Sequence, residues 1–113
     1  MTHYWITIHR PNGYDPAVAE DEAMARAIDA LNDEMVAAGV RVFVGGLQPL
    51  TTAKSLRPQS DGTVTVTDEP YLRTPEHVGG FWVLATGSLE EALAWGRKAA
   101  IACRAPVEVR PFH

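Results

Sequence analysis

The sequence has little cysteine, no long apolar stretch and no cluster of positive charge. Its one cysteine, Cys103, rules out an internal disulfide and a CxxC or multi-thiolate metal site. We interpret Cys103 as a small buried residue in a reducing compartment, with a nucleophile as the alternative. No apolar stretch reaches the roughly 18 residues of a membrane span, and the N-terminus lacks a basic region followed by a long apolar segment. We therefore expect a soluble, unprocessed, cytoplasmic protein.

Charge and histidine spacing exclude further classes. The formal net charge is -4, and the ten Lys and Arg residues are scattered, so direct binding of nucleic acid is not expected. His3 and His9 are roughly 20 Å apart on an extended strand and cannot hold one metal ion. His77 and His113 are isolated in the sequence. The Gly-Gly pair before the most apolar strand lacks the strand-to-helix setting of a nucleotide-binding loop. We predict neither a metal nor a cofactor.

Periodicity predicts the first half of the fold. Residues 3–9, "HYWITIH", alternate apolar and polar positions, which is typical of a strand with two different faces. Asp15 and Pro16 supply an N-cap and a first helical residue, and Gly39 a C-terminal cap, so one amphipathic helix is expected over 16–38. Residues 40–47 follow as a second strand.

The second half adds a hairpin before it repeats this pattern. Residues 52–68 contain two short extended pieces around the turn Ser60-Asp61-Gly62. A buried strand over 79–85 precedes a helix over 88–100, where Ser88 and Glu91 have capping-box spacing. Residues 105–112 close the chain as a strand. The 113 residues therefore form one domain, 1–113, of α+β class. Its expected architecture is the ferredoxin-like βαββαβ order with an inserted β-hairpin.

Both helices are expected on one face of the sheet. The residues expected to face them are Tyr4, Ile6, Ile8, Val42, Val44, Val107 and Val109. The residues expected on the other face are His3, Trp5, Thr7, His9, Arg41, Phe43, Glu108 and Arg110, with either the pair Trp82 and Leu84 or the pair Phe81 and Val83. This second face is too aromatic for water and too polar for an ordinary core. A homodimer that packs two such faces together around a cavity is the expected solution.

Four segments carry a resemblance to a known family: "GLQPLTTAKSLR", "DGTVTVTDEPYLRTPEHVGGFWVL", "SLEEALAW" and "VEVRPF". In their order and spacing the chain resembles the YCII-related proteins, specifically the branch named for an Asp-Gly-Pro-Phe motif. The resemblance implies a ferredoxin-like fold that dimerises as an alpha-beta barrel. It also implies small bacterial proteins that are often encoded beside alternative sigma factors. More distant relatives of the barrel include muconolactone isomerase-like, dehydrochlorinase-like and heme-free monooxygenase-like enzymes, several of which use a histidine and an aspartate.

The chain departs from the family motif at several positions. Where the family has Asp-Gly-Pro-Phe, this sequence has the run from Asp68 to Tyr71, with the glycine and phenylalanine replaced. The usual lysine further on is missing, and the histidine near the first helix has no counterpart between Ala17 and Ala38. The residues that carry over are Asp68, Pro70, Thr74, Glu76, Gly79, Gly80 and Phe81.

Asp68 and His9 are the candidate catalytic residues. A carboxylate held beside aromatic rings acquires a pKa useful for proton transfer, although Asp68 can equally cap a turn before Pro70. His9 is its proposed partner, with a structural hydrogen-bonded histidine as the alternative.

The candidate substrate-binding residues surround this pair. Arg110 can clamp a carboxylate or form ion pairs within a dimer, and Glu76 can hold a cation or a salt bridge. Trp5, Tyr71 and Trp82 can form pocket walls or ordinary dimer core.

Two function classes follow. The first is a cofactor-free homodimeric barrel that binds a small anionic or aromatic metabolite and performs isomerase or lyase chemistry. The second is a non-catalytic binding or regulatory module in a sigma-factor pathway.

Overall fold

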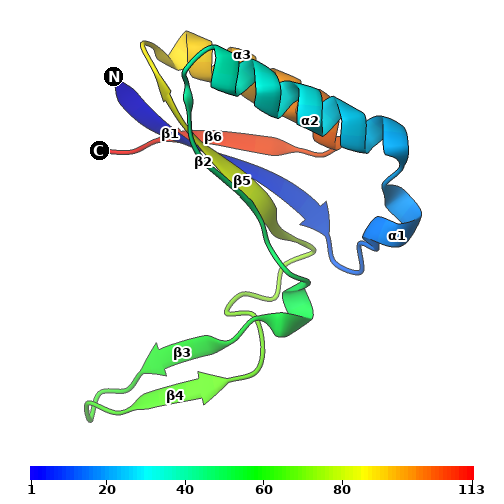
Figure 1. Ribbon diagram of the computed structural model, residues 1–113. Coiled ribbons are helices and arrows are strands. Elements are labelled where there is room, and N and C mark those ends of the chain that lie inside the picture. The colour runs from blue at the N-terminus through cyan, green and yellow to red at the C-terminus, as the bar shows by residue number, and fades with distance from the viewer.

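Two layers make up the main body, with helices over one face of a sheet (Figure 1). The structure is a computed structural model that describes all residues 1–113. Four antiparallel strands lie in the order β2 (Arg41–Gly46), β5 (Glu76–Thr86), β1 (Thr2–Pro11) and β6 (Val107–Pro111). Helices α2 (Glu22–Ala37) and α3 (Leu89–Cys103) cover one face. This confirms the ferredoxin-like α+β fold.

The helix expected over 16–38 is in fact two helices. Asp15 and Pro16 begin α1 (Pro16–Ala19) as predicted, but the chain leaves the helical conformation at Glu20. Asp21 then caps α2, because its side chain accepts a hydrogen bond from the Met24 N–H at 2.9 Å. The predicted cap at the other end is confirmed by Gly39, whose φ of +70° places it in the left-handed region that glycine favours.

Helix α3 begins with the predicted cap and packs closely on β6. Ser88 accepts from the Glu91 N–H at 3.2 Å, while the Glu91 carboxylate accepts from the Gly87 N–H at 2.9 Å. Gly96 faces the sheet, where an added Cβ would lie only 2.7 Å from a methyl group of Val109. The absence of a side chain at Gly96 therefore sets how closely the helix approaches the strand.

The core lies between the helices and the sheet. Tyr4, Ile6 and Ile8 are buried there, as predicted, and so are Trp82 and Leu84 of β5. The alternation along β5 therefore leaves Phe81 and Val83 on the open face. The buried cluster consists of Ile6, Ile8, Leu31, Met35, Val40, Trp82, Leu84, Ala99, Ala102 and Cys103, with Val44, Val107 and Val109 packed against it.

A bulge in β2 overturns the expected orientation of two residues. Arg41 pairs with Leu84 and Phe43 with Val83, so Val42 is an extra residue in the ladder. Arg41 consequently reaches the helix side, where its guanidinium donates to the Asn32 side-chain oxygen at 3.3 Å. Val42, expected in the core, is 53% exposed.

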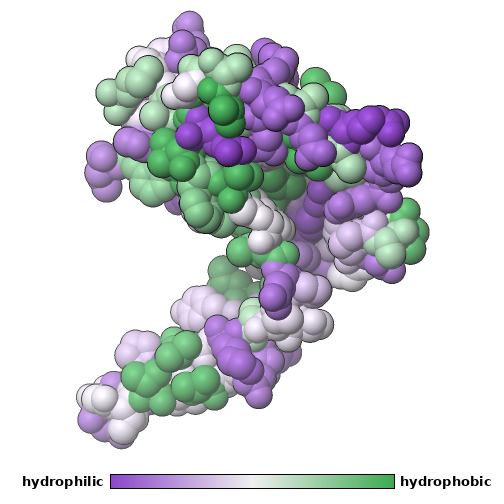
Figure 2. Space-filling model, in the orientation of Figure 1, coloured by the Kyte–Doolittle hydropathy of each residue, from purple (hydrophilic) through white to green (hydrophobic).

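The predicted hairpin is present and projects away from the helices (Figure 1). A short 3-10 turn, η1 (Leu50–Thr52), leads into β3 (Ser55–Pro58), which pairs with β4 (Val64–Thr67) in a separate two-stranded sheet. Gly62 takes a φ of +89° at the turn. One face of the hairpin is apolar and lies open in Figure 2; it consists of Leu56, Pro58, Val64 and Val66.

Candidate functional site

Aromatic side chains gather on the open face of the sheet. The Trp5 and Phe81 rings meet edge to face with centroids 6.4 Å apart, and Phe43 stacks on Phe81 at 5.7 Å. The Arg110 guanidinium lies over the Trp5 ring at 5.5 Å. Phe43 is 57% exposed, and no helix covers this side of the sheet (Figure 1).

His9 and Arg110, two of the predicted site residues, share this open face. The His9 ring nitrogen Nε2 lies 3.0 Å from the Thr7 hydroxyl oxygen, on the central strand β1. Arg110 pairs with Glu108 at 3.5 Å on the edge strand β6, and both side chains are more than half exposed. Arg110 pairs with Trp5 across the β1–β6 ladder and lies over its ring, and Trp5, Thr7 and His9 alternate along β1, so the structure places His9, Trp5 and Arg110 on the same face.

Three other predicted residues lie outside this cluster. Asp68, just after the hairpin, is exposed and pairs with Lys54 at 2.7 Å. Tyr71 is exposed beneath the Arg57 guanidinium, 4.5 Å from its ring centroid. Glu76 is the exposed first residue of β5. None of the three contacts the open-face aromatic cluster through a hydrogen bond or ion pair within the chain.

Trp82 lies on the opposite side of the sheet from Trp5. It is 2% exposed, and its indole N–H donates to Asn32 of α2 at 3.0 Å. Trp82 therefore belongs to the core beneath the helices rather than to a wall beside Trp5.

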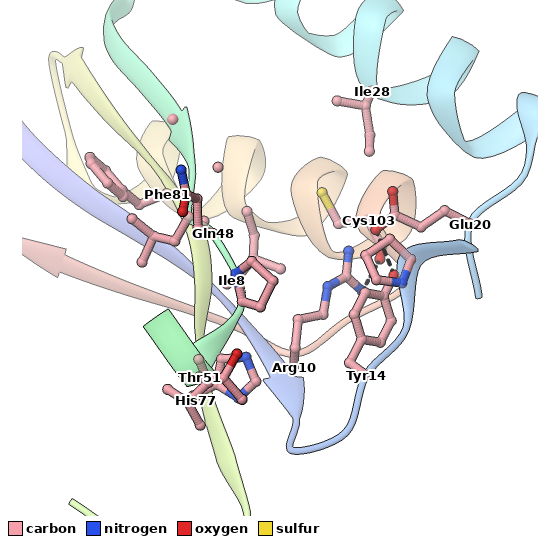
Figure 3. Close-up of a pocket in the computed structure, with 18 of the residues that line it drawn as sticks. Ile8, Arg10, Tyr14, Glu20, Ile28, Gln48, Thr51, His77, Phe81 and Cys103 are labelled. Carbon is pink, nitrogen blue, oxygen red and sulfur yellow. Dashed lines mark hydrogen bonds between the residues drawn. The ribbon is translucent and has the colours of Figure 1, made fainter. Parts of the chain in front are cut away.

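A cavity lies on the helix side of the sheet, at the end where β1 and β2 finish (Figure 3). Its volume is about 420 Å³, which is within the usual range for small-molecule sites of roughly 300–1,000 Å³. Apolar walls come from the sheet and the helices, namely Ile8, Trp82 and Ile28. The polar side chains that face it are Arg10, Tyr14, Glu20, Gln48, Thr51 and His77.

Arg10 is held at one side of this cavity. It continues the buried alternation of β1 and donates from Nη1 to the carbonyl oxygen of Cys103 at 2.7 Å. Cys103 is the last residue of α3, so the guanidinium neutralises the partial negative charge of a helix C-terminus. The guanidinium also lies over the Tyr14 ring, 4.4 Å from its centroid. Two contacts on different elements thus fix its position.

Tyr14 and Glu20 form a pair beside Arg10. The Tyr14 hydroxyl donates to the Glu20 carboxylate at 2.8 Å. Partial burial, and then this hydrogen bond, raise the pKa of the Tyr14 hydroxyl above its usual value. Tyr14 is therefore a proton donor at neutral pH, and its hydrogen bond occupies one oxygen of Glu20.

Cys103 lines the cavity without the properties of a nucleophile. Burial raises the pKa of its thiol, and the nearby Arg10 charge only partly opposes that rise. The thiol is therefore protonated at neutral pH, which agrees with the interpretation of Cys103 as a small buried residue.

Gly79 makes room for the Arg10 side chain. β5 carries one extra residue here, because Ile8 pairs with Gly80 while His9 pairs with Val78. A Cβ at Gly79 would lie 2.8 Å from Cγ of Arg10. The first glycine of the pair that the sequence analysis took as the start of a strand thus leaves space for an arginine on the neighbouring strand.

Sequence reasoning missed this cavity. The signal was the alternation of β1, in which Arg10 occupies the position after the buried Tyr4, Ile6 and Ile8. An arginine at the next inward-facing position of such a strand needs a hydrogen-bond partner on the core side of the sheet.

The described residues include no group of three or more His, Cys, Asp or Glu side chains positioned to hold a metal ion. No helix has the length and apolar character needed to cross a membrane.

Fold and site together define a small ferredoxin-like α+β domain with an open aromatic sheet face and a separate cavity under its helices. A model of the YCII-related domain matches residues 1–112, so the chain belongs to the YCII-related family. An uncharacterised protein of Rhizobium meliloti (strain 1021) is 37% identical over 95 residues, which cover 82% of this chain and 76% of that protein. The predicted family is therefore confirmed.

Proposed function

We propose that this protein is a homodimer that binds a small molecule in the cavity beside Arg10. The cavity of about 420 Å³ is the observation that carries the binding function. It combines an apolar interior with a few convergent polar groups, which is the usual composition of a small-molecule site. The carried-over motif residues also support a place for the chain in the Asp-Gly-Pro-Phe branch of the family.

Excess surface supports the homodimer. The chain exposes 7655 Å², whereas a compact monomer of its mass exposes about 6,100 Å². The difference of roughly 1,500 Å² exceeds the approximately 800 Å² that each partner contributes to a standard interface. Exposed apolar side chains of that surface include Phe43 on the open sheet face and Leu56, Val64 and Val66 on one face of the hairpin. Two open faces packed together cover the Trp5 cluster and place His9 and Arg110 at the interface.

Light scattering after size-exclusion chromatography tests the dimer. The wild-type protein should have twice the mass of the chain, and Phe43→Glu should be monomeric because it places a charge in the packed face. Ile101→Glu is the matched control, since Ile101 is 73% exposed on α3, away from the open face. A monomeric wild type at micromolar concentration would overturn the dimer.

A cavity-filling variant tests the binding site. Gly46 lines the cavity, and an added Cβ there meets no atom within 4 Å. Gly46→Phe should therefore fold and lose the thermal stabilisation that fragments of a small-molecule library give the wild type. Ala94→Phe, on the exposed side of α3, is the control. Fragments that stabilise Gly46→Phe as strongly as the wild type would show that they bind elsewhere.

Acid–base catalysis by Asp68 and His9 is a second candidate. Asp68 lies at the base of the projecting hairpin, and contact of that hairpin with a partner would carry Asp68 toward the partner's sheet. Asp68→Asn should then abolish deuterium exchange into a bound ligand while the melting temperature changes by only a few degrees. Unfolding of the variant would instead support a structural role for the Asp68–Lys54 pair.

A further inference from the structure

Arg10 differs from every other cationic side chain of the protein. Each of the remaining nine Lys and Arg residues is exposed, whereas Arg10 is partly buried. Six of those nine pair with a carboxylate within 4 Å, and Arg10 pairs with none. A partly buried cation without an anionic partner is costly, so a site of this kind favours an anion.

The contacts of Arg10 leave most of its hydrogen-bonding capacity free. A guanidinium carries five N–H donors, and only one of them, on Nη1, has an acceptor in the protein. The Tyr14 ring supports one face of the guanidinium, so its in-plane donors are directed past the ring rather than into it. The Glu20 carboxylate is near, but it is bonded to the Tyr14 hydroxyl and lies beyond ion-pair distance from Arg10.

The rest of the cavity selects the body of the ligand. Ile8, Ile28 and Trp82 give it apolar walls on the sheet and helix sides. At the rim, the His77 ring is oriented by a contact of 2.9 Å between its Nδ1 and the Asn12 side-chain oxygen. The arrangement therefore combines one cationic anchor, Arg10, with apolar walls, as in Figure 3.

We propose that the cavity binds a small carboxylate with an apolar body, and that Arg10 clamps the carboxylate group. A planar carboxylate matches the fork of a guanidinium and can accept two parallel N–H bonds from it. The carboxylate also supplies an anion at ion-pair distance from Arg10, which no side chain of the protein does, since the nearby Glu20 is bonded to Tyr14. This inference rests on the proposed function, because it names the ligand class of the same cavity.

Matched acid and amide probes test it. Indole-3-acetate and benzoate should bind, as measured by calorimetry, and their neutral amides indole-3-acetamide and benzamide should bind at least about tenfold more weakly. Arg10→Lys keeps the charge and loses the fork, so it should weaken binding of the acids by about tenfold. Arg97→Lys is the control, since Arg97 is exposed on α3 and outside the cavity.

Two further measurements keep the test independent of the folding of the Arg10 variant. Gly79→Ala should weaken binding of the acids, because the new Cβ displaces the stem of Arg10. In the wild type, the acids should shift the backbone amide resonances of Ile8, Gly46 and Gly80 and leave those of Trp5 and Arg110 unchanged.

The outcomes separate this inference from the proposed function. Amides that bind as well as the acids would overturn the carboxylate assignment and leave small-molecule binding in place. If both acids fail to bind while other fragments still occupy the cavity, the carboxylate assignment is likewise wrong and small-molecule binding remains. If Arg110→Lys weakens binding of the acids and Arg10→Lys does not, the anchor is on the open face and the inference is wrong.

Discussion

The indole N–H of Trp82 donates a hydrogen bond to the side-chain oxygen of Asn32 at 3.0 Å, which joins strand β5 to helix α2. A buried indole N–H needs a partner, and Asn32 is the one that the core provides. The same oxygen accepts from Arg41, and the Asn32 amide donates to the Ile28 carbonyl at 3.2 Å. Asn32 therefore ties the helix layer to two neighbouring strands.

Asn32→Ala should lower the free energy of unfolding by about 1–3 kcal/mol, because it leaves the buried Trp82 N–H without an acceptor. Chemical denaturation measures the change, with Asp33→Ala on the exposed side of α2 as the control. In a Trp82→Phe background, which has no N–H to satisfy, Asn32→Ala should cost less. An equal cost in both backgrounds would show that the hydrogen bond is not the source.

Gly96→Val should lower the free energy of unfolding by about 1–3 kcal/mol, since it forces α3 away from β6. The closest atom to the new side chain is a Val109 methyl group, at 2.7 Å from an ideal Cβ. Ala94→Val lies on the exposed side of the same helix and carries the same β-branched penalty without the clash. Equal denaturation midpoints for the two variants would contradict the close packing.

Asp21 should give the protein a stability contribution that acid removes. Its hydrogen bonds with the Arg104 guanidinium, and then with the Met24 N–H, hold the pKa of the Asp21 carboxyl below its ordinary value of 3.8. A pKa that is lower in the folded state means that the contribution is present above 3.8 and is lost as the pH falls through the folded value.

Asp21→Asn isolates this charge effect, because asparagine can still cap α2. The variant should melt at a lower temperature than the wild type near neutral pH, and the melting temperatures of the two proteins should become equal in acid. Salt should narrow the difference, since both side chains of the ion pair are about half exposed. A difference that does not depend on pH would assign the effect to the shape of the cap.

Leu56→Asp should weaken the proposed dimer by at least about tenfold, because it charges the apolar face of the hairpin. Leu56 is 62% exposed and pairs with Val66 on that face. Thr65→Asp changes the opposite face of the same hairpin and is the control. Sedimentation equilibrium gives both dissociation constants, and equal values would remove the hairpin from the interface.

Cys103 should react slowly with a thiol reagent near neutral pH in the native protein. The residue is 3% exposed, and burial raises the pKa of its thiol, so little reactive thiolate is present. Denaturant should restore the rate to that of a free thiol. Complete modification of the native protein within the mixing time would show that the end of α3 opens readily.

Local signals in the sequence were sufficient for the order of the elements. Asp15, Gly39 and Ser88 cap helices as expected because each cap depends on a side chain and a few adjacent backbone groups. The hairpin turn at Gly62 is equally local. The break between α1 and α2 was missed. Asp21 ends one helix and begins another because its side chain caps α2 and also binds Arg104, and Arg104 is 83 residues away in the sequence.

The amino-acid sequence thus determined the α+β class, the family and the alternation that puts Ile6 and Ile8 in the core, because these follow from patterns within one segment. Tertiary structure alone decided which face of β5 carries Trp82, how the bulge turns Val42 outward and where Arg10 lies. Each of these depends on a partner from a distant segment: Asn32, the register of β2 on β5, and the last carbonyl group of α3. The cavity exists only where those segments meet, so no single stretch of sequence could have shown it.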